Sequence, residues 1–298
     1  MIFYQCKEKF LVLYLVPRTK LIPDIIICMP KEIKVLVSGA HGKMGQAVVR
    51  AVSNEVGLKL VSGVDRSDNP NIGKDIGILC GINESGVKLT GNLKDAFSKN
   101  RPDVMVDFTM PEIVFVNAEM ALKAGVRVVI GTTGMSKDDI SELSKLSKQN
   151  SCGAIVAPNF ATGAILMMRF AKEASKYFAN AEIIEYHHDK KLDAPSGTSI
   201  KSAELMSENR KMFGRDTLVG KETIKGARGA ISEGNIHIHS VRLPGLIAHQ
   251  EILLASLGQT LTIRHDTYDR TAFMPGVLMA IKKVMELDYL VYGLENII

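Results

Sequence analysis

From Ile33 onward, short apolar runs alternate with amphipathic stretches, and this alternation restricts the fold more than any other feature of the sequence. Apolar runs predict buried strands, and apolar residues recurring every three or four positions predict helices. Repeated strand–helix–strand units form a parallel sheet covered by helices, so the chain is predicted to be α/β. The strands are expected at 33–37, 60–64, 104–108, 126–130 and 154–157, and the helices from Lys43, over 111–124 and from Ser136, where Asp139 approximates a capping box.

The character of the sequence changes after Pro158. A helical pattern covers 163–178, an alternating strand follows at 182–187, and later apolar stretches are separated by turns that contain glycine. We therefore predict a second, α+β domain with a mixed or antiparallel sheet, and a last helix at 272–286 that returns to the first domain. The remaining strands of the second sheet are expected at 236–242, 250–255 and 260–265.

Composition and charge exclude several classes of protein. With 46% hydrophobic and 23% charged residues among 298, the chain has the composition of a globular protein rather than of a disordered or membrane chain. The formal net charge of +5 comes from dispersed basic residues, which argues against a nucleic-acid partner and suits small anionic ligands. The four cysteines form no CxxC pair, so neither a zinc site nor a disulfide framework is indicated, and we expect a cytoplasmic protein.

Residues 1–29 precede the first predicted strand and contain one apolar run at 10–16. The run is too short to span a bilayer and no small-residue cleavage site follows it, so neither export nor a membrane association is expected. We interpret 1–29 as a disordered leader without a role in the fold, or as an over-long start with Met29 as the true first residue.

A glycine-rich turn separates the first predicted strand from its helix. Glycine lets the backbone approach a dinucleotide pyrophosphate, and the helix start supplies free N–H groups and the positive end of its dipole. Asp65 ends the second strand, 20 residues after Gly45, where an acid binds the ribose hydroxyls of NADH. The adjacent Arg66 suits the 2′-phosphate of NADPH, so either cofactor is expected. The turn comprises Gly39, Ala40, His41, Gly42, Lys43, Met44 and Gly45. A tight turn that binds nothing is the alternative.

Two further segments, 131–134 and 157–160, follow predicted strands. They lie at the edge of the sheet where ligands bind in open α/β folds. Read alone, each segment is equally compatible with ordinary turn chemistry.

The segment 185–198 concentrates the reactive side chains of the second domain. His187 and His188 are followed by Lys191, and 196–198 stand where a helix is expected to begin. Backbone amides at a helix start suit a carboxylate ligand. Adjacent histidines on a strand point to opposite faces and no cysteine or carboxylate cluster completes a ligand shell, so no metal site is predicted. A solvated polar loop is the remaining alternative.

Taken together, these motifs resemble those of the 4-hydroxy-tetrahydrodipicolinate reductase family, formerly called dihydrodipicolinate reductases. The motif HHxxKxDAPSGT, which begins at His187, carries most of the resemblance, because it is far more specific than a glycine turn. GAHGKMG, DFT (Asp107 to Thr109), GTTG and APNF occur in the family's order, and the resemblance spans 33–281. The chain departs from the pattern at Lys43, where arginine is usual, and its leader has no counterpart in the family.

The resemblance implies an NAD(P)H-dependent reductase that converts 4-hydroxy-tetrahydrodipicolinate, a small cyclic dicarboxylate, to tetrahydrodipicolinate in lysine and diaminopimelate biosynthesis. It implies a Rossmann-type dinucleotide-binding domain at 30–158 plus 271–298. A substrate-binding domain at 159–270 would assemble the chain into a homotetramer.

The resemblance also assigns roles to residues. His187 is the acid/base residue and Lys191 the proton donor. Substrate contacts fall on His188, Ser196, Gly197 and Thr198. Cofactor contacts outside the glycine turn fall on Asp65, Arg66, Phe108, Thr109, Gly131, Thr132, Thr133, Ala157, Pro158, Asn159 and Phe160.

Two other functions share part of this pattern. Aspartate and homoserine dehydrogenases share the nucleotide-binding half, but the His-His-x-x-Lys segment argues against them. A non-catalytic NAD(P) sensor is expected to have lost its acid/base residues, whereas His187, His188 and Lys191 are all present.

Overall fold

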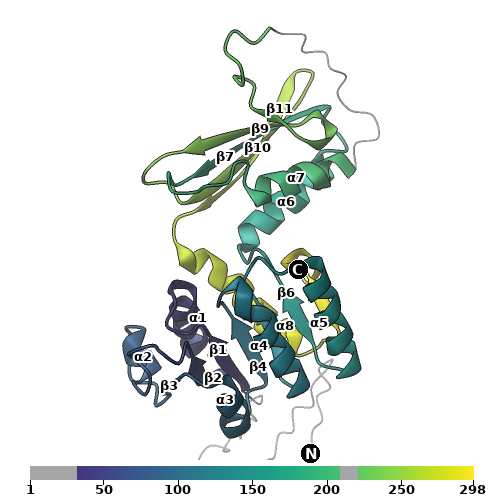
Figure 1. Ribbon diagram of the computed structural model, residues 1–298. Helices are drawn as coiled ribbons and strands as arrows, with labels where there is room; N and C mark the ends of the chain where they lie inside the picture. Colours follow the sequence, from purple (N-terminus) through teal and green to yellow (C-terminus); the bar gives the residue numbers. More distant parts are fainter. Residues whose placement is uncertain (1–31, 209–220) are drawn as a thin grey trace, which may run out of the picture.

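A seven-stranded parallel sheet organises one part of the chain in the computed structural model, which describes residues 32–208 and 221–298 (Figure 1). The strand order is β12-β6-β5-β4-β1-β2-β3. Its strands are β1 (Ile33–Ser38), β2 (Leu58–Val64), β3 (Leu89–Thr90), β4 (Val104–Asp107), β5 (Arg127–Ile130), β6 (Ala154–Val156) and β12 (Leu290–Tyr292). The interpretation of 1–29 as a leader lies outside the described residues.

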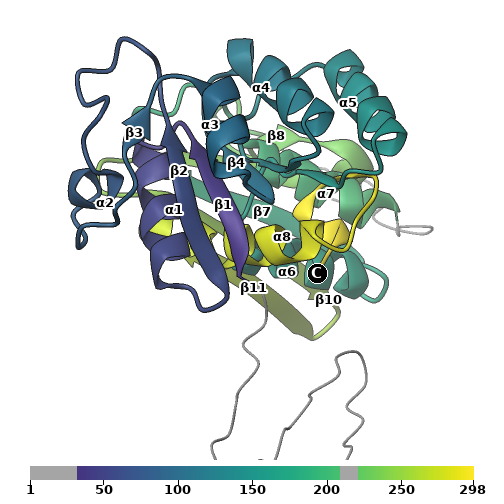
Figure 2. The ribbon, with the colours of Figure 1, turned by 90° about the horizontal axis from the view of Figure 1, so that it is seen from below.

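Helices cover both faces of this sheet, because successive side chains of a buried strand point to opposite sides. Val35 and Val37 of β1 belong to one apolar cluster, while Leu36 between them belongs to the other. Figure 2 shows α1 and α8 below the sheet and α3, α4 and α5 above it. The helices are α1 (Lys43–Asn54), α2 (Ile76–Leu79), α3 (Leu93–Asn100), α4 (Pro111–Lys123), α5 (Lys137–Gln149) and α8 (Met274–Val284), with short 3-10 segments η2 (Arg270–Phe273) and η3 (Leu294–Asn296).

The capping signal predicted for α5 is present. Ser136 is the N-cap, its side chain accepts from the Asp139 N–H at 3.1 Å, and the Asp139 carboxylate accepts from the Ser136 N–H at 2.9 Å. This reciprocal pair satisfies two backbone donors that a helix start leaves free.

A five-stranded mixed sheet forms the second part of the chain, with strand order β11-β10-β7-β9-β8. Its central strands β7 and β9 are parallel, and the other pairs are antiparallel. Both α6 and α7 lie on one face of this sheet (Figure 1). The elements are α6 (Thr162–Ala174), β7 (Asn180–His187), α7 (Gly197–Glu208), β8 (Ala230–Ile231), the 3-10 segment η1 (Glu233–Asn235), β9 (His237–Arg242), β10 (Ala248–Ser256) and β11 (Gln259–Thr267).

Two connections join the two sheets: the chain passes from β6 into α6, and it returns from β11 through η2 into α8 (Figure 1). After α8, β12 pairs with β6 and adds an edge strand to the first sheet. The last helical pattern therefore returns to the parallel sheet. Helix α6 ends at Ala174 rather than at the predicted 178, where the Ser175 hydroxyl donates to the Lys172 carbonyl and to that of Met206 at the end of α7.

Candidate active site

The glycine-rich turn between β1 and α1 is packed so closely that two of its positions require glycine. Gly39 has a φ of 75°, and a Cβ there would lie 2.4 Å from the Phe108 carbonyl oxygen. A Cβ on Gly45 would lie 1.9 Å from the Gly39 carbonyl oxygen. The N-cap, Gly42, supplies no side-chain hydrogen bond and the first turn of α1 contains no acid, so the helix start suits an anion such as a pyrophosphate.

Asp65 ties the end of β2 to the glycine turn. Its carboxylate accepts from the His41 N–H at 2.9 Å, and from its neighbour's N–H at 2.9 Å. The Asn69 amide donates to the same carboxylate at 3.1 Å. Arg66 is exposed and forms an ion pair with Asp68 at 3.4 Å. The predicted ribose-binding acid therefore lies beside the turn, with the arginine at the surface next to it.

A buried carboxylate joins the ends of β4 and β5. Asp107 is 0% exposed, and it accepts from the Thr109 N–H at 3.0 Å and from the Thr132 hydroxyl at 2.9 Å. The Asn117 amide donates to it at 2.9 Å. Asp107 was not among the predicted contact residues, although it begins the DFT motif. It holds together two predicted cofactor residues, Thr109 and Thr132.

Aromatic contacts extend this arrangement to the end of β6. The rings of Phe108 and Phe160 lie 5.8 Å apart between centroids. A Cβ on Gly131 would lie 2.1 Å from the Phe108 ring, so the three strand ends meet at Phe108. Of the other predicted residues here, Ala157 is buried and Thr133 is exposed.

A cavity of about 340 Å³ lies between the two sheets. Pro158 and Asn159 line it from the connection after β6. From the second part of the chain, predicted residues that line it are His187, Lys191, Ser196 and Thr198. The glycine turn does not line this cavity, and neither do the predicted substrate residues His188, which is exposed, and Gly197. The structure thus brings together most of the predicted chemical residues from 187–198.

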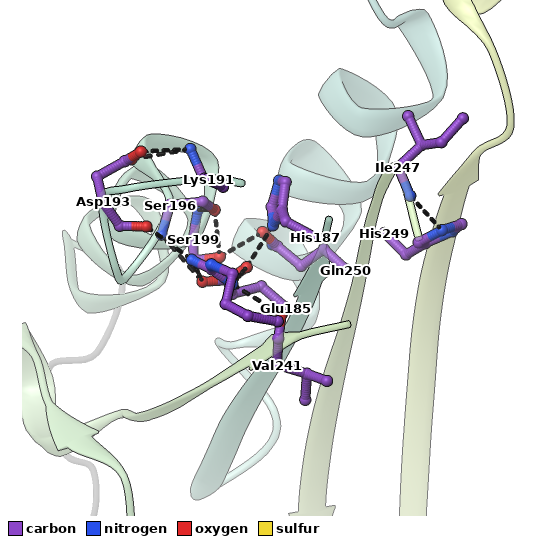
Figure 3. Close-up of polar contacts among 11 residues, drawn as sticks. Glu185, His187, Lys191, Asp193, Ser196, Ser199, Val241, Ile247, His249 and Gln250 are labelled. Carbon is purple, nitrogen blue, oxygen red and sulfur yellow. Dashed lines mark hydrogen bonds and ion pairs between the residues drawn. The ribbon is translucent and has the colours of Figure 1, made fainter. Parts of the chain in front are cut away.

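His187 is held by a buried carboxylate on its own strand. Glu185 is 0% exposed and contacts Nδ1 of His187 (Figure 3). Burial lowers the pKa of His187 below its usual value, while the hydrogen bond and the charge of Glu185 oppose this shift. Burial raises the pKa of Glu185, but hydrogen bonds from Arg242 and neighbouring groups outweigh it and hold that pKa below its usual value.

Lys191 also carries a local ion pair. Its Nζ lies 2.8 Å from both carboxylate oxygens of Asp193 (Figure 3). The hydrogen bond from Lys191 holds the pKa of Asp193 below its usual value. The Lys191 side chain is 21% exposed, so its ammonium is partly shielded from water while it borders the cavity.

The helix start at 196–198 is fixed by buried hydroxyls. Ser196 Oγ lies 2.8 Å from Ser199 Oγ, which donates to the Gln250 side chain at 2.8 Å. The Ser196 N–H donates to Glu185 at 3.2 Å. Among the residues that the structure describes, the N–H groups of Gly197 and Thr198 have no acceptor. These two amides are therefore the ones open to an anionic ligand.

Several side chains at this site were not predicted from the sequence. Glu185 stands two residues before His187, so period-two alternation placed both on one face of the strand and could have indicated it. Arg242, Gln250, His249 and His265 come from β9, β10 and β11, and no local pattern connects them to 185–198.

Among residues 32–208 and 221–298, no group of three or more His, Cys, Asp or Glu side chains is placed to hold a metal ion. None of the helices in those ranges combines the length and the apolarity needed to cross a lipid bilayer.

Models of one family match nearly all of the described residues. The model for the N-terminus of dihydrodipicolinate reductase matches 33–160, and the model for its C-terminus matches 163–298. The chain belongs to the dihydrodipicolinate reductase family. A 4-hydroxy-tetrahydrodipicolinate reductase of Desulfitobacterium hafniense is 53% identical, covering 89% of this chain and 98% of that protein. A Listeria monocytogenes protein of the same name is 49% identical, covering 89% and 99%.

Solved structures agree with this family. A dipicolinate-bound dihydrodipicolinate reductase from Paenisporosarcina sp. TG-14 superposes with a TM-score of 0.79 at 46% identity, covering 90% of this chain and 100% of that chain. An amine dehydrogenase from Mycobacterium smegmatis has a TM-score of 0.64 at 13% identity, a likeness of fold alone. Membership of the dihydrodipicolinate reductase family confirms the predicted fold class, the predicted reductase activity and the predicted use of NADH or NADPH.

Proposed function

We propose that this chain reduces 4-hydroxy-tetrahydrodipicolinate to tetrahydrodipicolinate with NADH or NADPH, in the cavity between its two sheets. The observation that carries the proposal is that His187, Lys191 and Thr198 border the same cavity as Pro158 and Asn159. One wall thus comes from the mixed sheet and the other from the carboxyl edge of the parallel sheet, where nucleotides bind in open α/β folds.

The dinucleotide would be held by the glycine turn. The start of α1, free of acids and of a side-chain cap, suits the pyrophosphate, and Asp65 lies beside it for the ribose. Thr109 and Thr132, fixed by Asp107, would hold the nicotinamide end. The bound cofactor supplies a hydride to the substrate ring.

The substrate's two carboxylates match groups at the cavity. The amide of Thr198, which lines the cavity, and that of Gly197 before it suit one carboxylate, and the ammonium of Lys191, which also lines the cavity, supplies a positive charge for the other. Loss of the substrate's hydroxyl group as water forms a conjugated imine. Hydride addition to this imine leaves negative charge on the ring, which a nearby acid neutralises by protonation. We assign that protonation to His187 and Lys191. His188 remains a proposed substrate contact, reached from the surface.

We further propose that the chain acts in the cytoplasm as a homotetramer, with 30–158 plus 271–298 as the dinucleotide-binding domain and 159–270 as the assembly domain. The face of the mixed sheet opposite α6 and α7 supports this assembly. It carries the partly exposed apolar side chains of Ile184, Tyr186 and Leu253 on neighbouring strands. Apolar side chains gathered on one sheet face are typical of subunit contacts.

A coupled assay tests the proposed activity. The purified protein is mixed with aspartate semialdehyde, pyruvate and NADPH or NADH. The mixture is tested with and without the synthase that condenses aspartate semialdehyde with pyruvate. Cofactor oxidation that depends on the synthase supports the proposal. Turnover of L-aspartate or homoserine with the oxidised cofactor, and none in the coupled assay, would refute it. Gel filtration with light scattering tests the tetramer.

A further inference from the structure

Both oxygens of the Glu185 carboxylate accept hydrogen bonds from neighbouring donors. Arg242 Nη1 donates to Oε2 and Nη2 donates to Oε1, each at 2.8 Å. The Ser196 N–H donates to Oε1 at 3.2 Å, and Nδ1 of His187 contacts Oε2. Removing a carboxylate from water is costly unless it is paired and hydrogen-bonded in this way, and the proposed reaction does not itself use this group.

An ionised carboxylate can only accept hydrogen bonds, so its contact with Nδ1 places the ring proton on that nitrogen. Among the described residues, Nε2 of His187 has no hydrogen-bond partner, and the side chain borders the cavity. We propose that Glu185 is a positioning residue that fixes the tautomer and the orientation of His187, and that Arg242 holds Glu185 in place. This inference rests on the proposed role of His187 in the reaction.

The charges around His187 give this arrangement a second effect. Glu185 is the acid in contact with the ring, whereas Lys191 and Arg242 both disfavour a protonated imidazole. The other charged or titratable groups that border this region are Asp193 on the same loop and His249 and His265 on β10 and β11. Without the charge of Glu185, the two cations and burial act on His187 unopposed, so its pKa falls further.

The pattern of donors predicts what an amide would do in place of the carboxylate. Each carboxylate oxygen receives one guanidinium N–H of Arg242, and Oε1 also receives the Ser196 N–H, which cannot give up its proton, whereas Nδ1 of His187 at Oε2 can. The oxygen of a glutamine therefore belongs at Oε1. Its NH₂ group then faces Nδ1 of His187, where it donates. The ring proton must move to Nε2, which reverses the tautomer.

A matched control lies on the opposite face of the same strand. Glu182 pairs with Arg228 at 2.6 Å and with His239 at 2.8 Å, so it has the same kinds of partner as Glu185. It does not border the cavity. Substitution of Glu182 therefore removes a carboxylate with arginine and histidine partners from β7 without removing any contact of His187. It measures the general effect of losing such a group from this strand.

The test compares Glu185→Gln, Glu185→Asp and Glu182→Gln in the full chain. Nitrogen-15 NMR of histidine-labelled protein reports the tautomer and pKa of each ring, with His187→Gln identifying the signal. We expect Glu185→Gln to reverse the His187 tautomer, lower its pKa and reduce kcat by about 10²-fold, while the Kd of NADPH stays unchanged. Glu185→Asp keeps the charge and is expected to restore the wild-type tautomer and part of kcat. Glu182→Gln is expected to leave the tautomer and the pKa of His187 as in the wild type.

A wild-type tautomer and pKa of His187 in Glu185→Gln would overturn the inference, as would the same change of the His187 tautomer in Glu182→Gln. If Glu185→Gln does not fold, the same NMR readout on Glu185→Asp decides, because a shifted tautomer there contradicts a role for the charge. The NMR measurement needs no substrate, so it tests the effect of Glu185 on the His187 tautomer even if the coupled assay finds no turnover.

Discussion

Arg242 lies directly opposite His187 in the parallel register of β7 and β9. Its guanidinium donates two hydrogen bonds to Glu185, which stands two residues before His187 on β7. The same guanidinium donates to the Asp193 carbonyl at 2.7 Å. Asp193 in turn holds Lys191. One arginine therefore connects the strand of the proposed acid/base residue to the loop of the proposed proton donor.

This connection makes Arg242 a stability determinant. Arg242→Met leaves the buried carboxylate of Glu185 without its cation, so we expect the free energy of unfolding to fall by roughly 3 kcal/mol. Arg228→Met removes the partner of the more exposed Glu182, and a loss of no more than about 1 kcal/mol is expected. Urea unfolding of both variants measures the difference. Equal losses in the two variants would contradict the prediction, and adding Glu185→Gln to Arg242→Met should recover part of the loss.

Turnover should depend on His187 and Lys191 separately from cofactor binding. Both border the cavity and neither belongs to the glycine turn, so we expect His187→Gln and Lys191→Ala to lower kcat by about 10²-fold or more while NADPH affinity stays near that of the wild type. The coupled assay and a fluorescence titration with NADPH measure the two quantities. Lys190→Ala, one position away and exposed, serves as the control and should retain wild-type kcat. Unchanged turnover in both active-site variants argues against the assigned roles.

The sequence predicted those parts of the fold that local pattern determines. The parallel strands β1, β2, β4, β5 and β6, the start of α1 at Lys43 and the cap of α5 at Ser136 were predicted, because period, glycine and capping residues act within a few positions. Short elements such as α2 and β3 were not predicted, because four and two residues are too few to show a period. Strand order was beyond the sequence, since β12 joins β6 from the other end of the chain.

The candidate site divides in the same way. His187, Lys191 and Thr198 lie within one motif, so a single stretch of sequence indicated all three. Arg242 is 57 residues from Glu185 and meets it only because β9 pairs in parallel with β7. No local signal encodes that pairing. The sequence thus indicated groups that border the cavity, and the tertiary fold was needed to show which distant side chains they contact.

The cap of α5 offers a stability change without a catalytic one. Ser136→Ala removes the side chain that accepts from the Asp139 N–H, so we expect a loss of about 1 kcal/mol in the free energy of unfolding. Kinetic constants should stay unchanged, because α5 does not border the cavity. Ser141→Ala, an exposed position inside the same helix, is the control and should be neutral or slightly stabilising. A loss no greater than that of the control would show that the cap contributes nothing.

Packing at the glycine turn predicts a cofactor-binding variant. Gly45→Ala places a methyl group 1.9 Å from the Gly39 carbonyl oxygen, so the turn must shift, and we expect at least a tenfold higher Kd for NADPH. Gly42→Ala is the milder comparison. Its Cβ would lie 3.2 Å from the same oxygen, so the turn needs to shift much less. Titration calorimetry of both variants ranks the effects. A Kd of Gly45→Ala equal to that of the wild type would contradict a role of the turn in cofactor binding.

The free energy of unfolding is expected to fall at acid pH, partly because His187 becomes protonated. Burial lowers the pKa of this ring in the folded chain below the usual 6.5, so the unfolded chain binds a proton more readily between 6.5 and the folded pKa. The stabilising contribution of the neutral ring is therefore complete above pH 6.5 and is lost as pH falls through the folded pKa. His187→Gln lacks this titration, so its unfolding free energy should decline less than that of the wild type as pH falls below 6.5. Urea unfolding at several pH values gives the free energy of unfolding of both proteins as a function of pH. Parallel curves would mean that burial does not lower the pKa of His187.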